Sequence, residues 1–327
     1  MRAAWYTELG GPEVLTVGER DTPEPGPGEI RVRLATSGVN PSDWKARKRG
    51  RDGKMPFPTI IPHSDGAGTI EAVGDGVDKA RIGRRVWVLN GQWKRPFGTA
   101  AEYICQTEKY VVDLPGGADL AEAACFGIPF LTAHRAVMYD GAVAGKTILV
   151  SGGAGAVGHH AIQVAKANGA RVLTTVSSDE KAAYAKTAGA DETINYRSED
   201  VARRVQEMTG GLGADRIVEL NISANAPLYD RILAPRGVAV IYGTNDLVAQ
   251  VPAQAFIPRG AELKWFIVYE LLDADLKAGI AALNAMLAAG TLKTTVAGRF
   301  PLTEIQAAHR MVEEARHMGN VVIDIDG

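Results

Sequence analysis

Short runs of apolar or β-branched residues, with glycine and proline between them, mark the first 120 residues of the chain. Pro23, Pro25 and Pro27 form a stiff connector that is not expected to be regular structure. Many short strands separated by such turns indicate a compact β-barrel. The expected strands are residues 3–6, 14–17, 29–35, 68–73, 85–89, 101–105 and 110–114.

After Pro115 the pattern changes, because alanine-rich helical segments begin to alternate with short apolar runs. Such alternation predicts a doubly wound parallel sheet. The expected helices cover residues 120–125, 130–138, the stretch ending at 168, 180–187, 200–208 and 227–233, and the expected strands cover 147–150, 172–176, 192–195, 216–220 and 237–242.

Two further helices and two further strands are predicted in the last quarter of the chain. A strand at 264–269 precedes a helix that has an apolar face and ends at Gly290. Thr303 and Gln306 have the spacing of a capping box and predict the start of a last helix. Residues 321–325 then form a closing strand.

The most informative stretch is a glycine turn between the expected strand 147–150 and the helix that follows it. Gly153, Gly155 and Gly158 form G-x-G-x-x-G, a weak signal alone in a chain with 37 glycines. The strand, turn, helix and strand around it supply the βαβ setting of a dinucleotide site. There the backbone amides and the helix dipole stabilise a pyrophosphate. A glycine-rich turn without a nucleotide is the alternative. The cofactor contacts predicted in the turn are Gly152, Gly153, Gly155, Ala156, Val157 and Gly158.

The end of the next strand indicates which dinucleotide is bound. A site for NAD usually has Asp or Glu there, to accept the ribose hydroxyls. This chain has Ser177 and Ser178 instead, followed by Lys181, and these groups can bind a 2′-phosphate that a carboxylate would repel. The sequence therefore favours NADPH. Asp179 keeps the alternative open, because a strand that ended two residues later would make it the ribose ligand.

Composition and charge limit the remaining possibilities. The chain has 327 residues, 46% hydrophobic and 23% charged, which is enough for two domains of a globular protein. A net charge of −2 gives no reason to expect nucleic acid. No apolar stretch is long enough to span a bilayer and no signal pattern opens the chain, so a cytoplasmic location is expected. Cys105 and Cys125 lack C-x-x-C spacing and are expected to be reduced and buried.

Several local stretches give the chain a family resemblance: residues 38–43, 66–74, 98–103, 131–133 and 194–197, together with the glycine turn. It resembles the medium-chain dehydrogenase/reductase superfamily, in particular the zinc-free quinone oxidoreductase branch, the zeta-crystallin-like proteins. The resemblance implies an α/β fold with a GroES-like β-barrel catalytic domain and a Rossmann doubly wound parallel-sheet domain, with the active site in the cleft between them. The barrel domain would be residues 1–120, completed by about 266–327, and the NADPH-binding domain residues 121–265.

The same resemblance argues against a catalytic zinc. Zinc-dependent relatives have a cysteine where this chain has Asn40, a His-Glu pair at Ser64 and Asp65, and a second cysteine near Ile128. Two cysteines are also too few for a four-thiolate structural site. A slipped site formed by His63 and Asp65 is the alternative. Without a Lewis acid, the expected chemistry is hydride donation to a quinone or to the β-carbon of an α,β-unsaturated carbonyl.

Further site residues follow from the resemblance. Asn40 and Thr132 match positions near the nicotinamide, and Lys45 stands close to where relatives often have a tyrosine. Lys45 is therefore a candidate to polarise a carbonyl, with a solvated lysine as the alternative. Trp44 and Trp93 either line the pocket for an aromatic acceptor or pack in the domain. The loop 90–97 is expected to determine which substrate shapes are accepted. The other cofactor contacts implied are Ser177, Ser178, Lys181, Tyr196, Asn221, Gly243, Thr244, Phe266 and Val268.

Two other functions remain open at this point. An enoyl-thioester reductase could use a basic run, Lys45, Arg47, Lys48, Arg49 and Arg51, to meet an acyl carrier's phosphates. A non-catalytic NADPH-binding structural or sensor protein is the other alternative. The resemblance also implies a homodimer that pairs two copies of the strand 264–269, which would otherwise be an open edge.

Overall fold

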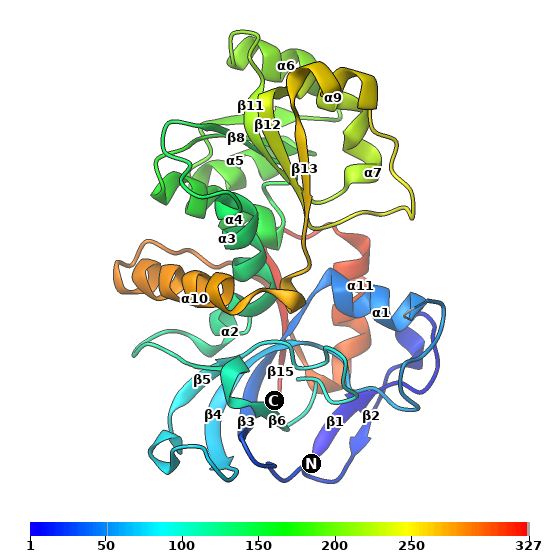
Figure 1. Cartoon of the computed structure of the whole chain (residues 1–327). Coiled ribbons are helices and arrows are strands. Elements are labelled where there is room, and N and C mark those ends of the chain that lie inside the picture. The colour runs from blue at the N-terminus through cyan, green and yellow to red at the C-terminus, as the bar shows by residue number, and fades with distance from the viewer. Residues whose placement is uncertain (51, 326–327) are drawn as a thin grey trace. The chain divides into compact units, whose positions relative to one another are not determined.

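The computed structural model describes residues 1–50 and 52–325, and it divides the chain into two compact units (Figure 1). The first unit contains residues 1–129, 287–290 and 294–327, and the second contains residues 130–286 and 291–293. The segment 266–286, which was expected to return to the barrel domain, belongs to the second unit. None of the described helices is both long enough and apolar enough to span a membrane.

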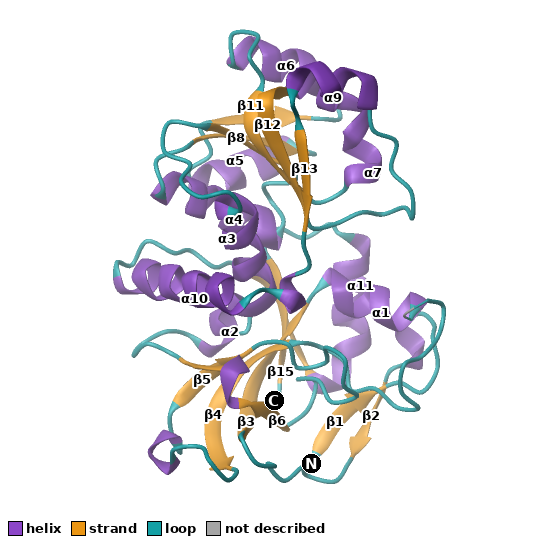
Figure 2. Cartoon of the chain, viewed as in Figure 1, coloured by secondary structure: helices purple, strands orange, loops and turns teal. Residues whose placement is uncertain are grey.

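The first unit is built on a curved, mostly antiparallel sheet in the order β14-β15-β3-β4-β5-β7, with β6 also pairing with β3 (Figure 2). The hairpin of β1 and β2 lies beside it. The strands are β1 (Arg2–Trp5), β2 (Thr16–Glu19), β3 (Glu29–Val39), β4 (Asp65–Val73), β5 (Arg85–Val88), β6 (Tyr103–Thr107), β7 (Val111–Asp113), β14 (Val296–Pro301) and β15 (Asn320–Asp324).

The C-terminal strand completes this sheet, as the sequence predicted. β15 pairs in antiparallel register with β3, where Val321 faces Val39 and Asp324 faces Thr36, and in parallel register with β14. One apolar core joins β1, β3 and β15 to the helix α11 (Ile305–Glu314). The other α-helices of this unit are α1 (Pro41–Arg49) and α2 (Leu120–Ala123).

The second unit is a six-stranded sheet in the order β10-β9-β8-β11-β12-β13, and every pairing in it is parallel. This order and the helical crossovers confirm the predicted doubly wound Rossmann sheet. The strands are β8 (Thr147–Val150), β9 (Arg171–Val176), β10 (Glu192–Asn195), β11 (Ala214–Glu219), β12 (Leu233–Ile241) and β13 (Glu262–Trp265). The helices are α3 (Leu131–Met138), α4 (Ala156–Ala167), α5 (Asp179–Thr187), α6 (Val201–Met208), α7 (Ile222–Asn225), α8 (Tyr229–Ile232), α9 (Ala253–Arg259) and α10 (Asp273–Ala288).

Two local predictions are wrong in detail. The strand expected at 264–269 is β13 at Glu262–Trp265, and a 3₁₀ turn follows at Val268–Glu270. The capping box is absent from α11, because Thr303 lies in a 3₁₀ turn before the helix and the N-cap is Glu304. Gln306 donates instead to the carbonyl oxygen of Leu15 at 2.9 Å, so this polar side chain ties the helix to the N-terminal segment.

Candidate nucleotide-binding and active site

The glycine turn after β8 has the geometry that its sequence requires. Gly152 has φ +72°, a left-handed conformation that favours glycine. A Cβ on Gly158 would clash with the Gly152 carbonyl, and a Cβ on Gly153 would clash with the Thr174 hydroxyl. The turn therefore packs tightly against α4 and β9. Gly155 is the N-cap of α4, so the first-turn amides at Ala156 and Val157 have no acceptor within the helix and remain able to bind an anion.

The end of β9 lies next to this turn. β9 ends at Val176, and Ser178 is the N-cap of α5, where its hydroxyl accepts a hydrogen bond from the Lys181 amide at 3.2 Å. Asp179 is thus in the first turn of α5 and not at the strand end. Within the described chain, Ser177 has no side-chain hydrogen bond and Lys181 forms no salt bridge. Both groups remain able to contact a ligand.

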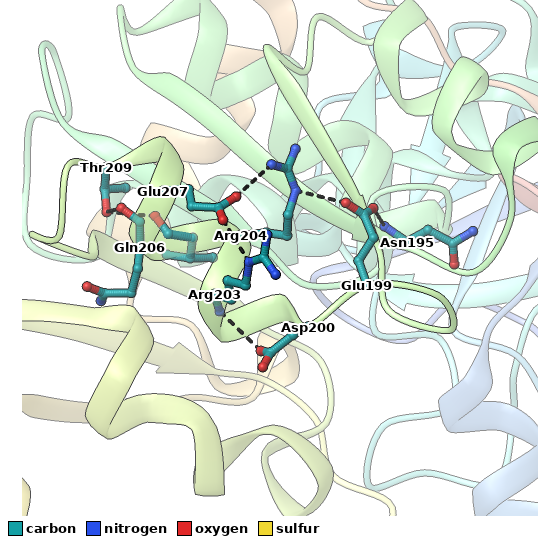
Figure 3. A network of polar contacts seen from close by, with 9 residues as sticks. Asn195, Glu199, Asp200, Arg203, Arg204, Gln206, Glu207 and Thr209 are labelled. Carbon is teal, nitrogen blue, oxygen red and sulfur yellow. Dashed lines mark hydrogen bonds and ion pairs between the residues drawn. The ribbon is translucent and has the colours of Figure 1, made fainter.

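Tyr196 follows β10, and its side chain is 52% exposed. Its amide donates to the Val176 carbonyl at 3.0 Å, which holds it beside the end of β9. Figure 3 shows the polar network below this turn: Glu199 accepts from the Asn195 amide at 2.7 Å and pairs with Arg204 at 2.8 Å. Arg204 also pairs with Glu207 at 3.0 Å, so the turn is anchored on α6. The Tyr196 side chain takes no part in this network and is exposed.

The ends of β11 and β12 are linked by one asparagine. The side-chain oxygen of Asn221 accepts from the Ser223 hydroxyl at 2.8 Å and from the Asn245 amide at 3.0 Å. Gly243 packs against the backbone at Leu220, where a Cβ would clash with the carbonyl oxygen. The Thr244 hydroxyl donates to the Asp246 carbonyl at 2.9 Å and belongs to the same exposed loop.

Phe266 and Val268 follow β13 at the same edge of the sheet. The Phe266 amide donates to the Ile241 carbonyl at 3.3 Å, its ring lies 6.3 Å from that of Tyr139, and Val268 is buried. The structure thus places each predicted cofactor residue just after the carboxyl end of a strand of one parallel sheet. Ligands of open α/β sheets bind at this edge.

Glu219, the last residue of β11, lies at one of these strand ends and was not singled out by the sequence analysis. It is completely buried and accepts hydrogen bonds from the Asn221 amide at 2.6 Å and the Tyr229 hydroxyl at 2.9 Å. A carboxylate inside the apolar run 216–220 was the available signal, because buried carboxylates are rare unless they have specific partners.

In the first unit, Asn40 belongs to a buried polar cluster. It is the N-cap of α1, its backbone amide donates to Asp43 at 2.7 Å, and its side-chain amide donates to Asp65 at 2.9 Å. Asp65 also accepts from the Ile128 amide at 2.9 and 3.0 Å. Burial raises the pKa of Asp65 to about 7, and burial also raises the pKa of Asp43 well above its usual value.

This cluster occupies the positions at which zinc-dependent relatives have their ligands, and its donor set does not fit a metal. Asp65 accepts hydrogen bonds from both the Asn40 side chain and the Ile128 amide, and the described residues contain no group of three His, Cys, Asp or Glu side chains able to hold an ion. His63, the other candidate, is hydrogen-bonded through one ring nitrogen to Ser37 at 2.8 Å and through the other to His309 at 2.9 Å. Neither nitrogen points to Asp65.

The other predicted catalytic residues lie in different parts of the chain. Lys45 is on α1 of the first unit, with its ammonium group 5.7 Å from the centre of the Trp44 ring. Burial, and then Arg49, lower its pKa. Trp44 packs against the apolar core of that unit. Thr132 is buried in the first turn of α3, in the second unit.

Comparison with known proteins gives similarities over the whole chain. Residues 156–285 match the family described as Zinc-binding dehydrogenase, and residues 26–116 match Alcohol dehydrogenase GroES-like domain. A quinone oxidoreductase of Pseudomonas aeruginosa is 33% identical, covering 97% of this chain and 98% of that protein. A 2-haloacrylate reductase of a Burkholderia species is 29% identical, with 98% of each chain covered.

Solved structures are similar over the same range. A structure described as an NAD-dependent alcohol dehydrogenase has a TM-score of 0.91 and 31% identity, covering 99% of this chain and 100% of that chain. The Escherichia coli quinone oxidoreductase complexed with NADPH has a TM-score of 0.90 and 25% identity, with the same coverage. These similarities extend over both units and not only over the nucleotide-binding sheet.

Proposed function

The chain belongs to the quinone oxidoreductase family of the medium-chain dehydrogenase/reductase superfamily, whose members are NAD(P)H-dependent oxidoreductases, and from this premise we propose a specific reaction. The protein transfers hydride from NADPH to quinones or to activated α,β-unsaturated carbonyl compounds, and it does so without zinc. The observation that carries the choice of cofactor is the end of β9. Ser177 and Lys181 stand there, and the nearest acidic residue in sequence, Asp179, has already entered α5.

The proposed cofactor contacts follow from that edge of the sheet. The first-turn amides of α4 bind the pyrophosphate, and Ser177, Ser178 and Lys181 bind the 2′-phosphate through charge-assisted hydrogen bonds. Tyr196 lies against the adenosine end. Asn221, Gly243, Thr244, Phe266 and Val268 border the nicotinamide ribose and ring. NADPH, when bound, supplies the hydride.

Zinc independence is supported by the chemistry of the donor set. Asn40 is a poor ligand for Zn²⁺, and Asp65 is committed to the Asn40 side chain and the Ile128 amide. A zinc ion serves alcohol oxidation as a Lewis acid that holds the alkoxide, whereas a quinone or an enal already accepts hydride readily. In the proposed reaction Asn40 and Thr132 orient the carboxamide or the substrate carbonyl, Lys45 polarises that carbonyl, and solvent supplies the proton.

The enoyl-thioester alternative has less support. An acyl carrier's phosphates would need free cations on α1, but Arg47 is fully buried and pairs with Glu313 at 3.1 Å, and Lys48 pairs with the same carboxylate at 2.5 Å. Arg51, another residue of that basic run, lies outside the described residues. A non-catalytic role predicts tight NADPH binding with no oxidation by any acceptor.

The test follows absorbance of the reduced nicotinamide with NADPH or NADH and a panel of 1,4-benzoquinone, 9,10-phenanthrenequinone and 2-alkenals. We expect oxidation of NADPH well ahead of NADH. The variant Ser177→Asp places a carboxylate at the end of β9, and we expect it to lower kcat/KM for NADPH at least about tenfold while leaving NADH unchanged or improved. Asp179→Asn is the matched control, and it should leave kcat/KM unchanged for both NADPH and NADH.

Three outcomes would contradict the proposal. If the wild type used NADH as well as or better than NADPH, and if Asp179→Asn lost the activity with NADH, Asp179 would be the residue that binds the ribose hydroxyls. Oxidation of simple alcohols with NAD⁺, lost on treatment with a chelator, would restore a zinc mechanism. Binding of NADPH without turnover across the whole panel would support the non-catalytic role.

We further propose that the protein is a cytoplasmic homodimer. β13 is an edge of the parallel sheet, and Trp265 and Ile267 at its end are 56% and 46% exposed. An apolar edge strand of this kind is a template for pairing with a second chain.

A further inference from the structure

A buried carboxylate without a cationic partner lies behind the nucleotide edge of the parallel sheet. Glu219 is 0% exposed, and within residues 1–50 and 52–325 it forms no salt bridge. Burying a carboxylate is costly unless hydrogen bonds replace its water. The protein supplies four hydrogen-bond donors to this carboxylate. They are the Ser151 hydroxyl at 3.2 Å, the Asn221 amide at 2.6 Å, the Asn225 side-chain amide at 2.9 Å and the Tyr229 hydroxyl at 2.9 Å.

The two oxygens of Glu219 face different parts of the site. Oε1 accepts from Asn221 and Asn225, so it fixes the turn between β11 and α7. Oε2 accepts from Tyr229 in the core and from Ser151, the residue directly before Gly152. Burial and the neighbouring Glu219 raise the pKa of Tyr229, so its hydroxyl keeps its proton and remains a donor. One carboxylate therefore links the glycine turn to the end of β11.

The link continues from β11 to β12 through Asn221. With its backbone held by Glu219, the Asn221 side chain accepts from the Asn245 amide at 3.0 Å, just after Gly243 and Thr244. The backbone supports the same connection, because the Tyr242 amide donates to the Glu219 carbonyl at 3.1 Å. Three loops at adjacent strand ends thus share one buried anchor.

The strand order shows which half of the cofactor these loops meet. The glycine turn for the pyrophosphate follows β8, and the 2′-phosphate groups follow β9, on one side of it. An extended dinucleotide that crosses this edge must then place its nicotinamide half over β11 and β12, on the other side. We infer that Glu219 is a positioning residue for the nicotinamide half of the NADPH site. This inference rests on the proposed function and adds to it a residue that touches no part of the cofactor.

The experiment compares two ligands on the same variants. NADPH uses the whole site, whereas 2′,5′-ADP uses only the adenosine half. Dissociation constants for both are measured by calorimetry for the wild type, Glu219→Leu, Glu219→Gln and Tyr229→Phe. We expect Glu219→Leu to raise the dissociation constant of NADPH about tenfold, in line with the loss of a buried hydrogen bond to a carboxylate. The dissociation constant of 2′,5′-ADP should stay within about twofold of the wild-type value. Glu219→Gln keeps one acceptor oxygen, so its affinity for NADPH should fall about threefold and its affinity for 2′,5′-ADP should not change.

Tyr229→Phe is the matched control, because it removes a donor to the same carboxylate on the side away from Asn221. It should leave both affinities within about twofold. An unchanged NADPH affinity in both Glu219 variants, or an equal loss for the two ligands, would overturn the inference. If Glu219→Leu does not fold, the near-isosteric Glu219→Gln decides. A wild type that binds neither ligand would refute the proposed NADPH site itself, which is a separate result.

Discussion

His159 shows how a single buried side chain ties the stability of the second unit to pH. It lies on α4, is 2% exposed, and stacks on Tyr184 with ring centres 4.3 Å apart. Neither ring nitrogen has a hydrogen-bond partner among the described residues. Burial, and then Lys293, lower the pKa of His159 to about 4, so the native protein holds this imidazole neutral.

Because the native state keeps His159 neutral, acid destabilises the fold. Between pH 4 and 6.5 the unfolded chain binds more protons at His159 than the native state does, so the native state loses stability as pH falls through this window. We predict that His159→Phe, which keeps the stacked ring, removes this loss. Between pH 7 and pH 5, the free energy of unfolding measured in urea should fall by about 2 kcal/mol more for the wild type than for the variant. His317→Phe, at a half-buried histidine, is the control, and a His159→Phe curve parallel to the wild type would refute the prediction.

At the same scale, the sequence predicted site residues where a short local pattern marks them. Gly153, Gly155 and Gly158 carry a spacing that only a turn of this kind needs, and Ser177 could be placed because β9 ends where its apolar run ends. Glu219 was not predicted, and Asp65 was considered only as a ligand of a slipped zinc site with His63. The Ile128 amide that binds Asp65 and the Ser151 hydroxyl that binds Glu219 lie 63 and 68 positions away in the chain. No local pattern encodes such long-range pairs.

Among the elements, β15 illustrates how a strand late in the sequence can lie in the interior of a sheet. It lies between β14 and β3, more than 280 residues from the latter in sequence, and Val321, Ile323 and Ile325 are buried in the core of the first unit. The C-terminal segment is therefore part of the fold of the first unit and not an extension of the second.

We predict that Ile323→Ala costs about 2–5 kcal/mol of unfolding free energy, because it leaves a cavity in a core that cannot fully collapse. Asp324→Ala on the same strand is the control. It removes only an ion pair with Arg299 whose side chains are 56% and 30% exposed, so its cost should stay below about 1 kcal/mol. Thermal and urea unfolding measure both. Equal small losses in the two variants would mean that β15 contributes little to the core.

Element boundaries were predicted well where apolar periodicity was strong and less well where chain geometry intervened. β8, β9, β10 and β11 lie within about two residues of their expected ranges. The last helix was displaced, because the chain forms a 3₁₀ turn at Leu302–Glu304 and uses Gln306 to reach Leu15. The strand expected at 264–269 ended early, because its pairing partner β12 ends at Ile241 opposite Trp265.

At the scale of the whole molecule, the edge of the second sheet at β13 is the surface where a second copy of the chain is expected to bind. β13 pairs with β12 on one side, and no described strand pairs with its other side. Trp265, Ile267 and Leu272 are 56%, 46% and 71% exposed on this strand and the segment that follows it. Large apolar side chains grouped along an unpaired strand are typical of a surface that another chain covers.

We predict that the protein sediments as a dimer at micromolar concentration and that Trp265→Glu makes it a monomer. A two-fold axis would pair the two β13 edges in antiparallel register and bring the Trp265 side chains of both copies into the same interface. A carboxylate there would be desolvated twice in each dimer, which is costly. Leu212→Glu is the control, because this leucine is 69% exposed but follows α6, away from the edge strand. A monomeric wild type, or a Trp265→Glu variant that remains dimeric, would show that the β13 edge is not where two copies meet.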